Sequence, residues 1–212
     1  MNIILIRHGQ TRWNKEEVFR GRADIPLDET GLAQAEATAR ALARVEIAAV
    51  YSSPLARAHE TARIIAGPHG LDVQLVDGFT DIDCGAWEGL PVQEARSRYP
   101  RMFEAWQKAP HTVTFPGGES LDIVSARAWT ALEQIAADRA NDEAVVVVSH
   151  RVVNKLILLK ALGLASSAFW KIRQDTCCLN IIEHGPGGYV LRLLNDRCHL
   201  VGGPIPGPTL DF

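Results

Sequence analysis

Short apolar runs alternate along the chain with stretches in which apolar residues recur every third or fourth position. Residues 3–6 and 144–148 are apolar throughout, which is typical of strands buried on both faces of a parallel sheet. Residues 119–138 have helical periodicity, and this predicts one buried helix face, made of Leu121, Val124, Ala128, Leu132 and Ile135. The alternation of the two patterns predicts an α/β protein.

Weaker signals complete the predicted order of elements. Residues 48–51 and 73–76 are expected to be strands, and residues 32–43, 55–65 and 152–162 helices. Ser53 and Pro54 are expected to supply the N-cap and the first-turn proline of the helix that follows them. Residues 178–182 and 189–194 flank a glycine-rich turn and predict an antiparallel hairpin. Together these elements predict a three-layer α/β/α sandwich with a mostly parallel, mixed sheet.

Residues 77–118 interrupt the regular pattern with prolines at positions 91, 100, 110 and 116. Short helical pieces are expected around Glu94 and Phe103, and the whole segment is predicted to form a small cap insertion. A chain of 212 residues is long enough for one domain with a sizeable core, so a single domain is predicted over residues 1–212. The Pro- and Gly-rich residues 202–212 are predicted to form a flexible tail.

Charge and cysteine content narrow the class of protein. A net charge of -3 argues against binding to nucleic acid, which depends on broad phosphate neutralisation, but allows a local basic pocket for a small anion. No apolar run is long enough to span a bilayer, and no signal-peptide pattern opens the chain. The four cysteines lack metal-site spacing, so we expect reduced cysteines in a cytoplasmic protein.

Chemically competent side chains follow the predicted strands. Arg7 and His8 end the first strand, His150 ends the strand at 144–148, and Arg57 lies in the first turn of the helix after the strand at 48–51. Ligands of open α/β sheets bind beyond the carboxyl ends of the strands, so these residues are expected to converge. A neutral imidazole is a competent nucleophile toward phosphorus, and guanidinium groups bind phosphate oxygens. The set favours phosphoryl transfer to His8.

Four sequence blocks resemble the signature of the histidine phosphatase superfamily, in its phosphoglycerate mutase-like branch. They are Arg7-His8-Gly9-Gln10-Thr11, Ser52-Ser53-Pro54-Leu55-Ala56-Arg57-Ala58, Cys84-Gly85-Ala86-Trp87-Glu88-Gly89 and Val147-Val148-Ser149-His150. The order of the blocks makes the likeness specific, and it covers nearly the whole chain. From position 81 onward the pattern most resembles metal-independent phosphoserine phosphatases.

The resemblance implies a role for individual residues. His8 is implied to become phosphorylated, with Arg7, Arg57 and His150 completing a phosphate pocket that Asn14 and Gly21 line. The implied general acid is Asp81, at a position where most of the family has glutamate, and the nearby carboxylates Asp83 and Glu88 are the alternatives. Three more residues are expected to touch substrate: Cys84, Arg20 and Arg151. For Arg20 and its neighbour Arg22, a solvated position in the loop is the alternative to contact with a substrate carboxylate, and Arg151 follows His150 where a small residue is more usual.

The activity expected from this reasoning is metal-independent and cofactor-free hydrolysis of small, carboxylated phosphate monoesters, such as phosphoserine-like or phosphoglycerate-like compounds. A cofactor-dependent phosphoglycerate mutase and a catalytically weak phospho-ligand binder are the alternatives, and the resemblance leaves a homodimer open. A zinc hydrolase is disfavoured because no His-Glu-x-x-His spacing occurs and the arginines would repel a cation. The hypothesis requires His8 to lie within a few ångströms of Arg57 and His150 and to be open to solvent.

Overall fold

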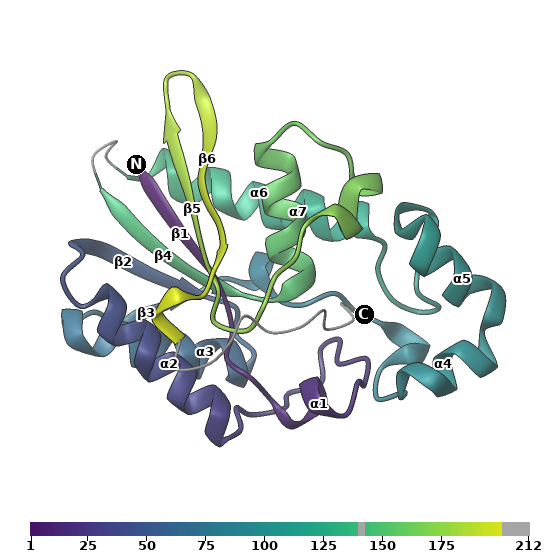
Figure 1. The fold of residues 1–212 in the computed structure, drawn as a ribbon. Coiled ribbons are helices and arrows are strands. Elements are labelled where there is room, and N and C mark those ends of the chain that lie inside the picture. The colour runs from purple at the N-terminus through teal and green to yellow at the C-terminus, as the bar shows by residue number, and fades with distance from the viewer. Residues whose placement is uncertain (140–142, 201–212) are drawn as a thin grey trace.

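The fold, seen in a computed structural model that describes residues 1–139 and 143–200, is a six-stranded mixed sheet between two layers of helices (Figure 1). The strand order is β3-β2-β4-β1-β5-β6. The strands are β1 (Asn2–Arg7), β2 (Ile47–Ser52), β3 (Val73–Leu75), β4 (Ala144–Ser149), β5 (Leu179–Gly185) and β6 (Gly188–Asp196). Strands β3, β2, β4 and β1 pair in parallel. Strand β5 pairs antiparallel with β1 and forms the predicted antiparallel hairpin with β6. The predicted sandwich is confirmed.

Strand alternation separates the core into two clusters, one on each face of the sheet. In β1, Ile3 and Leu5 belong to one cluster, and Ile4 and Ile6 to the other, because successive strand side chains point to opposite faces. Helices α6 (Leu121–Ala137) and α7 (Arg151–Ala161) cover the first face, and α2 (Glu29–Leu42) and α3 (Ala56–Ala66) cover the second. The continuous apolar runs of the sequence therefore reflect burial on both sides.

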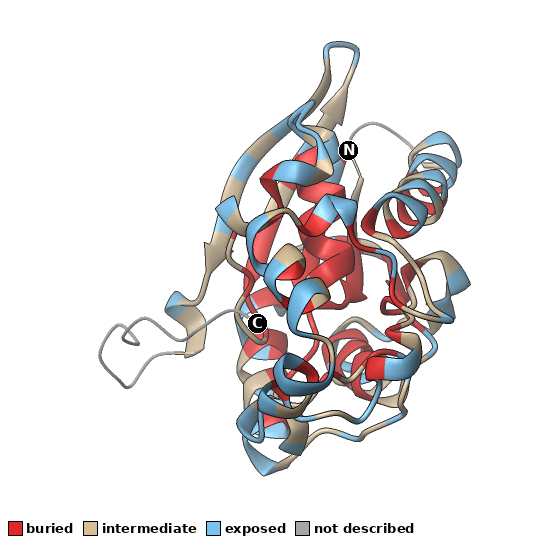
Figure 2. Ribbon diagram, turned by 90° about the vertical axis from the view of Figure 1, so that its right-hand side faces the viewer, coloured by how far each residue is buried: buried red, intermediate tan, exposed pale blue. Residues whose placement is uncertain are grey.

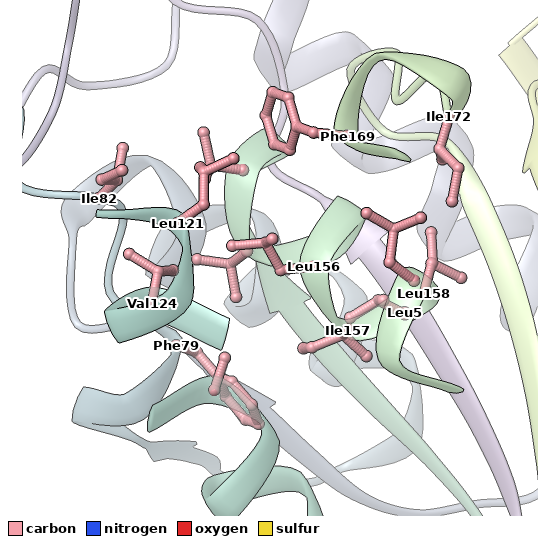
Figure 3. Close-up of a cluster of buried hydrophobic side chains, with 14 of the residues drawn as sticks. Leu5, Phe79, Ile82, Leu121, Val124, Leu156, Ile157, Leu158, Phe169 and Ile172 are labelled. Atoms are coloured by element: carbon pink, nitrogen blue, oxygen red, sulfur yellow. The ribbon is translucent and has the colours of Figure 1, made fainter. Parts of the chain in front are cut away.

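The larger cluster lies between the sheet and α6 and α7 (Figure 3). The five apolar positions predicted for the buried face of α6 are all buried. In α2, Ala35, Ala39 and Leu42 face the core and are buried, whereas Leu32 is exposed. Figure 2 shows the same arrangement for the whole chain, with buried residues in the interior and exposed residues on the outer sides of the helices.

The prediction that Ser53 and Pro54 begin α3 is wrong. The Ser53 amide donates to the Val148 carbonyl at 3.0 Å and so extends the sheet, and the N-cap of α3 is Leu55. The Ser53 hydroxyl lies 2.8 Å from Nε2 of His150 and accepts a 3.3 Å hydrogen bond from the Leu55 amide. The serine thus links the end of β2 to the residue that follows β4, and the helix begins two residues later than the local sequence suggests.

Residues 77–118 contain short helices, as predicted, and an aromatic cluster. The helices are α4 (Val92–Arg98) and α5 (Pro100–Lys108), and they lie beyond the carboxyl end of the sheet, on the side where α1 (Arg12–Lys15) is found (Figure 1). Trp87 contacts Phe103 and Phe115, and Phe115 contacts Trp106. All four rings are buried, so this segment is held by apolar packing despite its irregular backbone.

Two expectations from the sequence concern features outside the sheet. Within the described part of the chain, no helix combines the length and the apolar character that crossing a bilayer requires. All four cysteines lie in the described residues and none forms a disulfide. The tail predicted at 202–212 lies outside the described residues.

Candidate active site

The two histidines meet because their strands are neighbours. In the parallel pair β1 and β4, Arg7 lies opposite Ser149, and each of these residues ends its strand. The residue that follows each strand end is a histidine, so the two histidines lie side by side. The His8 amide donates to the Ser149 carbonyl at 2.9 Å, and the two imidazole ring centres are 5.2 Å apart. The sequence prediction that His8 and His150 converge at one edge of the sheet is confirmed.

Arg57 reaches the same place from the first turn of α3. Its side chain is fully buried, and it donates to the carbonyls of Ala23 at 2.7 Å and Gly21 at 3.0 Å. It also donates to Oδ2 of Asp81 at 3.1 Å. Its Nε atom has no partner among the described residues, which leaves a buried donor for a bound anion.

The hydrogen bonds of His8 determine which ring nitrogen is available. Nδ1 lies 2.7 Å from the Gly9 carbonyl oxygen. A carbonyl only accepts, so in the neutral ring Nδ1 carries the hydrogen and Nε2 keeps its lone pair. The imidazole is therefore held in the tautomer that a nucleophile needs.

Both histidines are held in the neutral form. Burial lowers the pKa of His8 well below its usual value of 6.5, and the positive charge of Arg57 lowers it further. The pKa of His150 is lowered for the same two reasons, in the same order. A histidine that stays unprotonated near neutral pH retains the lone pair needed to attack phosphorus.

A pocket of about 570 Å³ opens beside these residues. Its wall includes all but three of the residues expected to touch substrate, namely Arg7, Asn14, Arg20, Gly21, Asp81, Cys84 and Arg151. The other three, His8, Arg57 and His150, are buried, and both Arg57 and His150 lie beside Asp81 of the wall, at 3.1 and 3.6 Å. The pocket walls are thus rich in guanidinium groups, with Asp81 as the carboxylate next to Arg57.

The expectation that His8 is open to solvent is not met. The residue is 1% exposed and does not line the open pocket. Arg7, Arg20 and Asp81 line the open pocket, whereas the His8 side chain does not. Arg20 is the least constrained of these, since its one hydrogen bond is a 3.3 Å contact to the Trp13 carbonyl and its Nε has no partner in the described residues.

Comparison with known protein families identifies the class. The family model of the histidine phosphatase superfamily (branch 1) matches residues 3–197. The chain belongs to this superfamily. The superfamily resemblance inferred from the four sequence blocks is thereby confirmed, and so is the phosphoglycerate mutase-like fold.

Individual members of the superfamily are similar over almost the whole chain. Phosphoserine phosphatase 1 of Hydrogenobacter thermophilus is 37% identical over 200 residues, covering 94% of each chain. The adenosylcobalamin/alpha-ribazole phosphatase of Escherichia coli is 30% identical over 201 residues, covering 93% of this chain and 97% of its own. The solved structure of Bacillus stearothermophilus YhfR superposes with a TM-score of 0.89 at 32% identity, covering 94% of this chain and 99% of its own.

Asn14 and Gly21, which the superfamily resemblance assigns to a phosphate pocket, both line the pocket of about 570 Å³. Oδ1 of Asn14 accepts from the amide and hydroxyl of Thr11 at 2.9 and 2.8 Å, which leaves the NH₂ group for a ligand. Gly21 has a φ of +50°, and a Cβ there would lie 2.5 Å from Oε2 of Glu88. The positive φ and these close contacts favour glycine at this position.

The loop that carries Asp81 is anchored by two residues that the sequence reasoning missed. Arg127, on α6, donates to the carbonyls of Gly78 at 2.8 Å and Asp81 at 3.0 Å. It also forms a 2.9 Å ion pair with Glu119, whose other oxygen accepts from the Asp83 amide at 3.0 Å. No local signal identifies Arg127, because its contact with the Asp81 carbonyl joins residues that are 46 positions apart in the sequence.

Further contacts surround the residues that are expected to bind phosphate. Arg7 donates to the Gln174 carbonyl at 2.6 Å, and the Gly9 amide donates to the Thr61 hydroxyl at 3.1 Å. Arg22 turns away from the pocket and pairs with Glu119 at 3.4 Å. Burial raises the pKa of the Cys84 thiol, so Cys84 lines the pocket as a small apolar group instead of a reactive thiolate.

The pH dependence of stability is expected to report the buried histidines. The folded pKa values of His8 and His150 are depressed, so the unfolded chain binds more protons below about pH 6.5. The contribution of the two histidines to the free energy of unfolding is therefore fully present above that pH. It decreases as the pH falls, by at most about 1.4 kcal/mol per pH unit for each histidine. Urea denaturation between pH 7.5 and 5.5 measures this slope.

His8→Gln removes one of the two titrating groups and should give a shallower slope than the wild type. His59→Gln, a change on α3 at a histidine that does not line the pocket, is the matched control and should keep the wild-type slope. Identical slopes for wild type and His8→Gln would show that His8 is not held neutral by the fold.

Proposed function

We propose that this protein hydrolyses small phosphate monoesters by transferring the phosphoryl group to Nε2 of His8. The observation that carries the proposal is the convergence of His8, His150 and Arg57 beside a pocket lined by arginines, in a chain of the histidine phosphatase superfamily. The hydrogen bond from Nδ1 of His8 to the Gly9 carbonyl supports the nucleophilic tautomer.

In the first step, Nε2 of His8 attacks phosphorus while the bond from phosphorus to the ester oxygen breaks. Arg7 and Arg57 bind the phosphate oxygens, Asn14 and His150 add donors, and Gly21 allows close approach of the backbone. Nδ1 of His150 has no hydrogen-bond partner among the described residues, which supports a role as a donor to the anion.

Asp81 is proposed to protonate the departing oxygen and later to accept a proton from the water that attacks phosphohistidine. Oδ2 of Asp81 lies 3.1 Å from Arg57 and 3.6 Å from Nδ1 of His150, so the carboxyl group belongs to the same cluster. The carboxyl group therefore lies beside the guanidinium group that is proposed to bind the phosphate, which supports its assignment as the proton donor to the departing oxygen.

The proposed substrates are small phosphate esters, and no metal is required. Related members of the superfamily, a phosphoserine phosphatase and an alpha-ribazole phosphatase, support this substrate class. Residues 77–118 supply Cys84, Trp106 and Phe115 to the pocket wall, which supports their proposed role as a cap within a single catalytic domain. A cytoplasmic location and a homodimer stay predictions from the sequence.

Phosphate release from a panel of phosphorylated metabolites, including phosphoserine, phosphoglycerates and sugar phosphates, tests the proposal. We expect turnover without a bisphosphate primer and with full activity in excess chelator. Interconversion of phosphoglycerates that needs such a primer would indicate a mutase. Binding without turnover of any ester, including p-nitrophenyl phosphate, would indicate a phospho-ligand binder.

A further inference from the structure

We propose that Glu119, paired with Arg127, is a positioning residue that holds the carboxyl group of Asp81 at the proposed phosphate site. The inference rests on the proposed function and deepens it, because it names a residue on which the proton-transfer step depends. Glu119 does not line the pocket, so it acts on the reaction through Asp81 and not by touching the substrate.

The pair between Glu119 and Arg127 is bidentate and largely shielded from water. Nε of Arg127 donates to Oε1 of Glu119 at 2.9 Å, and Nη2 donates to Oε2 at 3.0 Å. The Arg127 side chain is 21% exposed and that of Glu119 13%, so solvent screens this pair less than a surface pair. Burial by itself would raise the pKa of Glu119, but the hydrogen bonds from Arg127 and from the Asp83 amide outweigh it and lower that pKa. Glu119 is therefore an ionised carboxylate that is held by one guanidinium group.

The pair binds the backbone on both sides of the Asp81 side chain. Arg127 donates to the carbonyl oxygens of Gly78 at 2.8 Å and Asp81 at 3.0 Å. Glu119 binds both backbone groups of Asp83, because its Oε2 accepts from the Asp83 amide at 3.0 Å and its own amide donates to the Asp83 carbonyl at 2.9 Å. Together these hydrogen bonds fasten residues 78–83, the acid loop, to Glu119 and Arg127.

Backbone packing also brings the segment before α6 directly against the acid loop. A Cβ at Gly118 would lie 2.3 Å from the Asp83 carbonyl oxygen, so a side chain at this position would push the two segments apart. Next to this contact, the Ala86 amide donates to the Pro116 carbonyl at 2.9 Å. Residues 116–119 thus form the surface against which the acid loop lies, and Glu119 is the charged member of that surface.

The position of the acid loop determines where the carboxyl group of Asp81 lies. Oδ1 accepts from the Ile82 amide at 2.9 Å, within the loop itself. Oδ2 lies 3.1 Å from Nη2 of Arg57 and 3.6 Å from Nδ1 of His150. Because the side chain is short and bound to its own loop, it moves with the loop relative to Arg57 and His150. A misplacement of about 1 Å can cost about 100-fold in rate, so the contacts of Glu119 and Arg127 bear directly on proton transfer.

A second cation beside Glu119, Arg22, is the weaker partner. Its Nη2 lies 3.4 Å from Oε1 of Glu119 and its side chain is 45% exposed, and exposed ion pairs contribute little to stability. The backbone at Arg22 is held separately, since its amide donates to Glu88 at 2.8 Å. The main consequence of losing the Glu119 carboxylate therefore falls on Arg127 and the acid loop.

The first test compares substrates that differ in their need for a proton. In Glu119→Ala, kcat for the alkyl ester that turns over fastest in the metabolite panel is expected to fall about 10- to 100-fold, because the carboxyl group of Asp81 is misplaced. The burst of p-nitrophenolate, which departs without a proton, should keep its rate within about threefold. Glu119→Gln retains an oxygen that can accept from the Asp83 amide, so it should lose less than Glu119→Ala.

A double-mutant cycle tests whether Glu119 acts through Asp81. Once Asp81→Asn has removed the acid, adding Glu119→Ala should lower kcat for the alkyl ester by less than about twofold further, because the carboxyl group that Glu119 positions is already absent. A residue that only supports the fold would lower kcat by the same factor in both backgrounds. Losses that multiply in this way would contradict the inference.

Glu104→Gln is the matched control, because Glu104 is an exposed glutamate on α5 that pairs with Lys108 at 2.6 Å and does not line the pocket. It should keep both rates within about twofold. Melting temperatures check that each variant is folded, and if Glu119→Ala is unfolded at the assay temperature, Glu119→Gln takes its place in both tests. Unchanged kcat for the alkyl ester in a folded Glu119 variant, or an equal loss in the burst rate, would overturn this inference alone. Failure of the wild type to hydrolyse any phosphate ester would overturn the proposed function, and the inference with it.

Discussion

Replacing His8 with alanine is expected to lower kcat by about 10⁵-fold, because the residue that forms the covalent intermediate has no substitute in the site. Rapid acid quench of the wild type with a phosphorus-labelled substrate should trap an acid-labile phosphoenzyme, and His8→Ala should trap none. The buried ring also packs against His150, so the melting temperature of the variant must be measured alongside its kinetics.

A second histidine variant separates loss of the nucleophile from loss of structure. His59→Ala, on α3 and outside the pocket wall, should retain the phosphoenzyme and most of the turnover. A phosphoenzyme that survives in a folded His8→Ala protein would place the nucleophile elsewhere and refute the mechanism.

Asp81→Asn is expected to lower kcat for alkyl phosphate esters by about 10²- to 10⁴-fold, the usual contribution of a general acid. The loss should depend on the leaving group. p-Nitrophenolate needs no proton to depart, so the variant should release one equivalent of it in a burst. Turnover should then be slow, because the phosphoenzyme lacks the base that activates water. Stopped-flow absorbance measures both phases.

Two further variants test whether the general acid is Asp81 or its neighbour Asp83. Asp81→Glu restores the acid with one more methylene and should retain more activity than Asp81→Asn. Asp83→Asn removes the carboxylate that accepts the Gly85 amide at 2.8 Å, and it is expected to cost less than about tenfold because this group does not reach the Arg57 cluster. A larger loss in Asp83→Asn than in Asp81→Asn would transfer the role of acid to Asp83.

Local patterns in the chain were sufficient for most of the fold. The strands at both histidines and the buried face of α6 follow from strand runs and from helical periodicity, because these signals depend on burial alone. The start of α3 could not be predicted in this way. Ser53 has the residue type of an N-cap, but a hydrogen bond to Val148 keeps it in the sheet and its hydroxyl contacts His150.

The amino-acid sequence by itself predicted the proposed nucleophile and the proposed phosphate-binding residues. His8, Arg7 and His150 lie at recognisable strand ends, Arg57 lies at a helix start, and the family blocks contain all four. Only the tertiary structure decided how these groups are held: the tautomer of His8, the pairing of Asp81 with Arg57, and the anchoring of the acid loop by Arg127. The tertiary structure also buries His8, whose exposed fraction is only 1%. These properties depend on contacts between residues far apart in the chain, and no local pattern of residue types contains them.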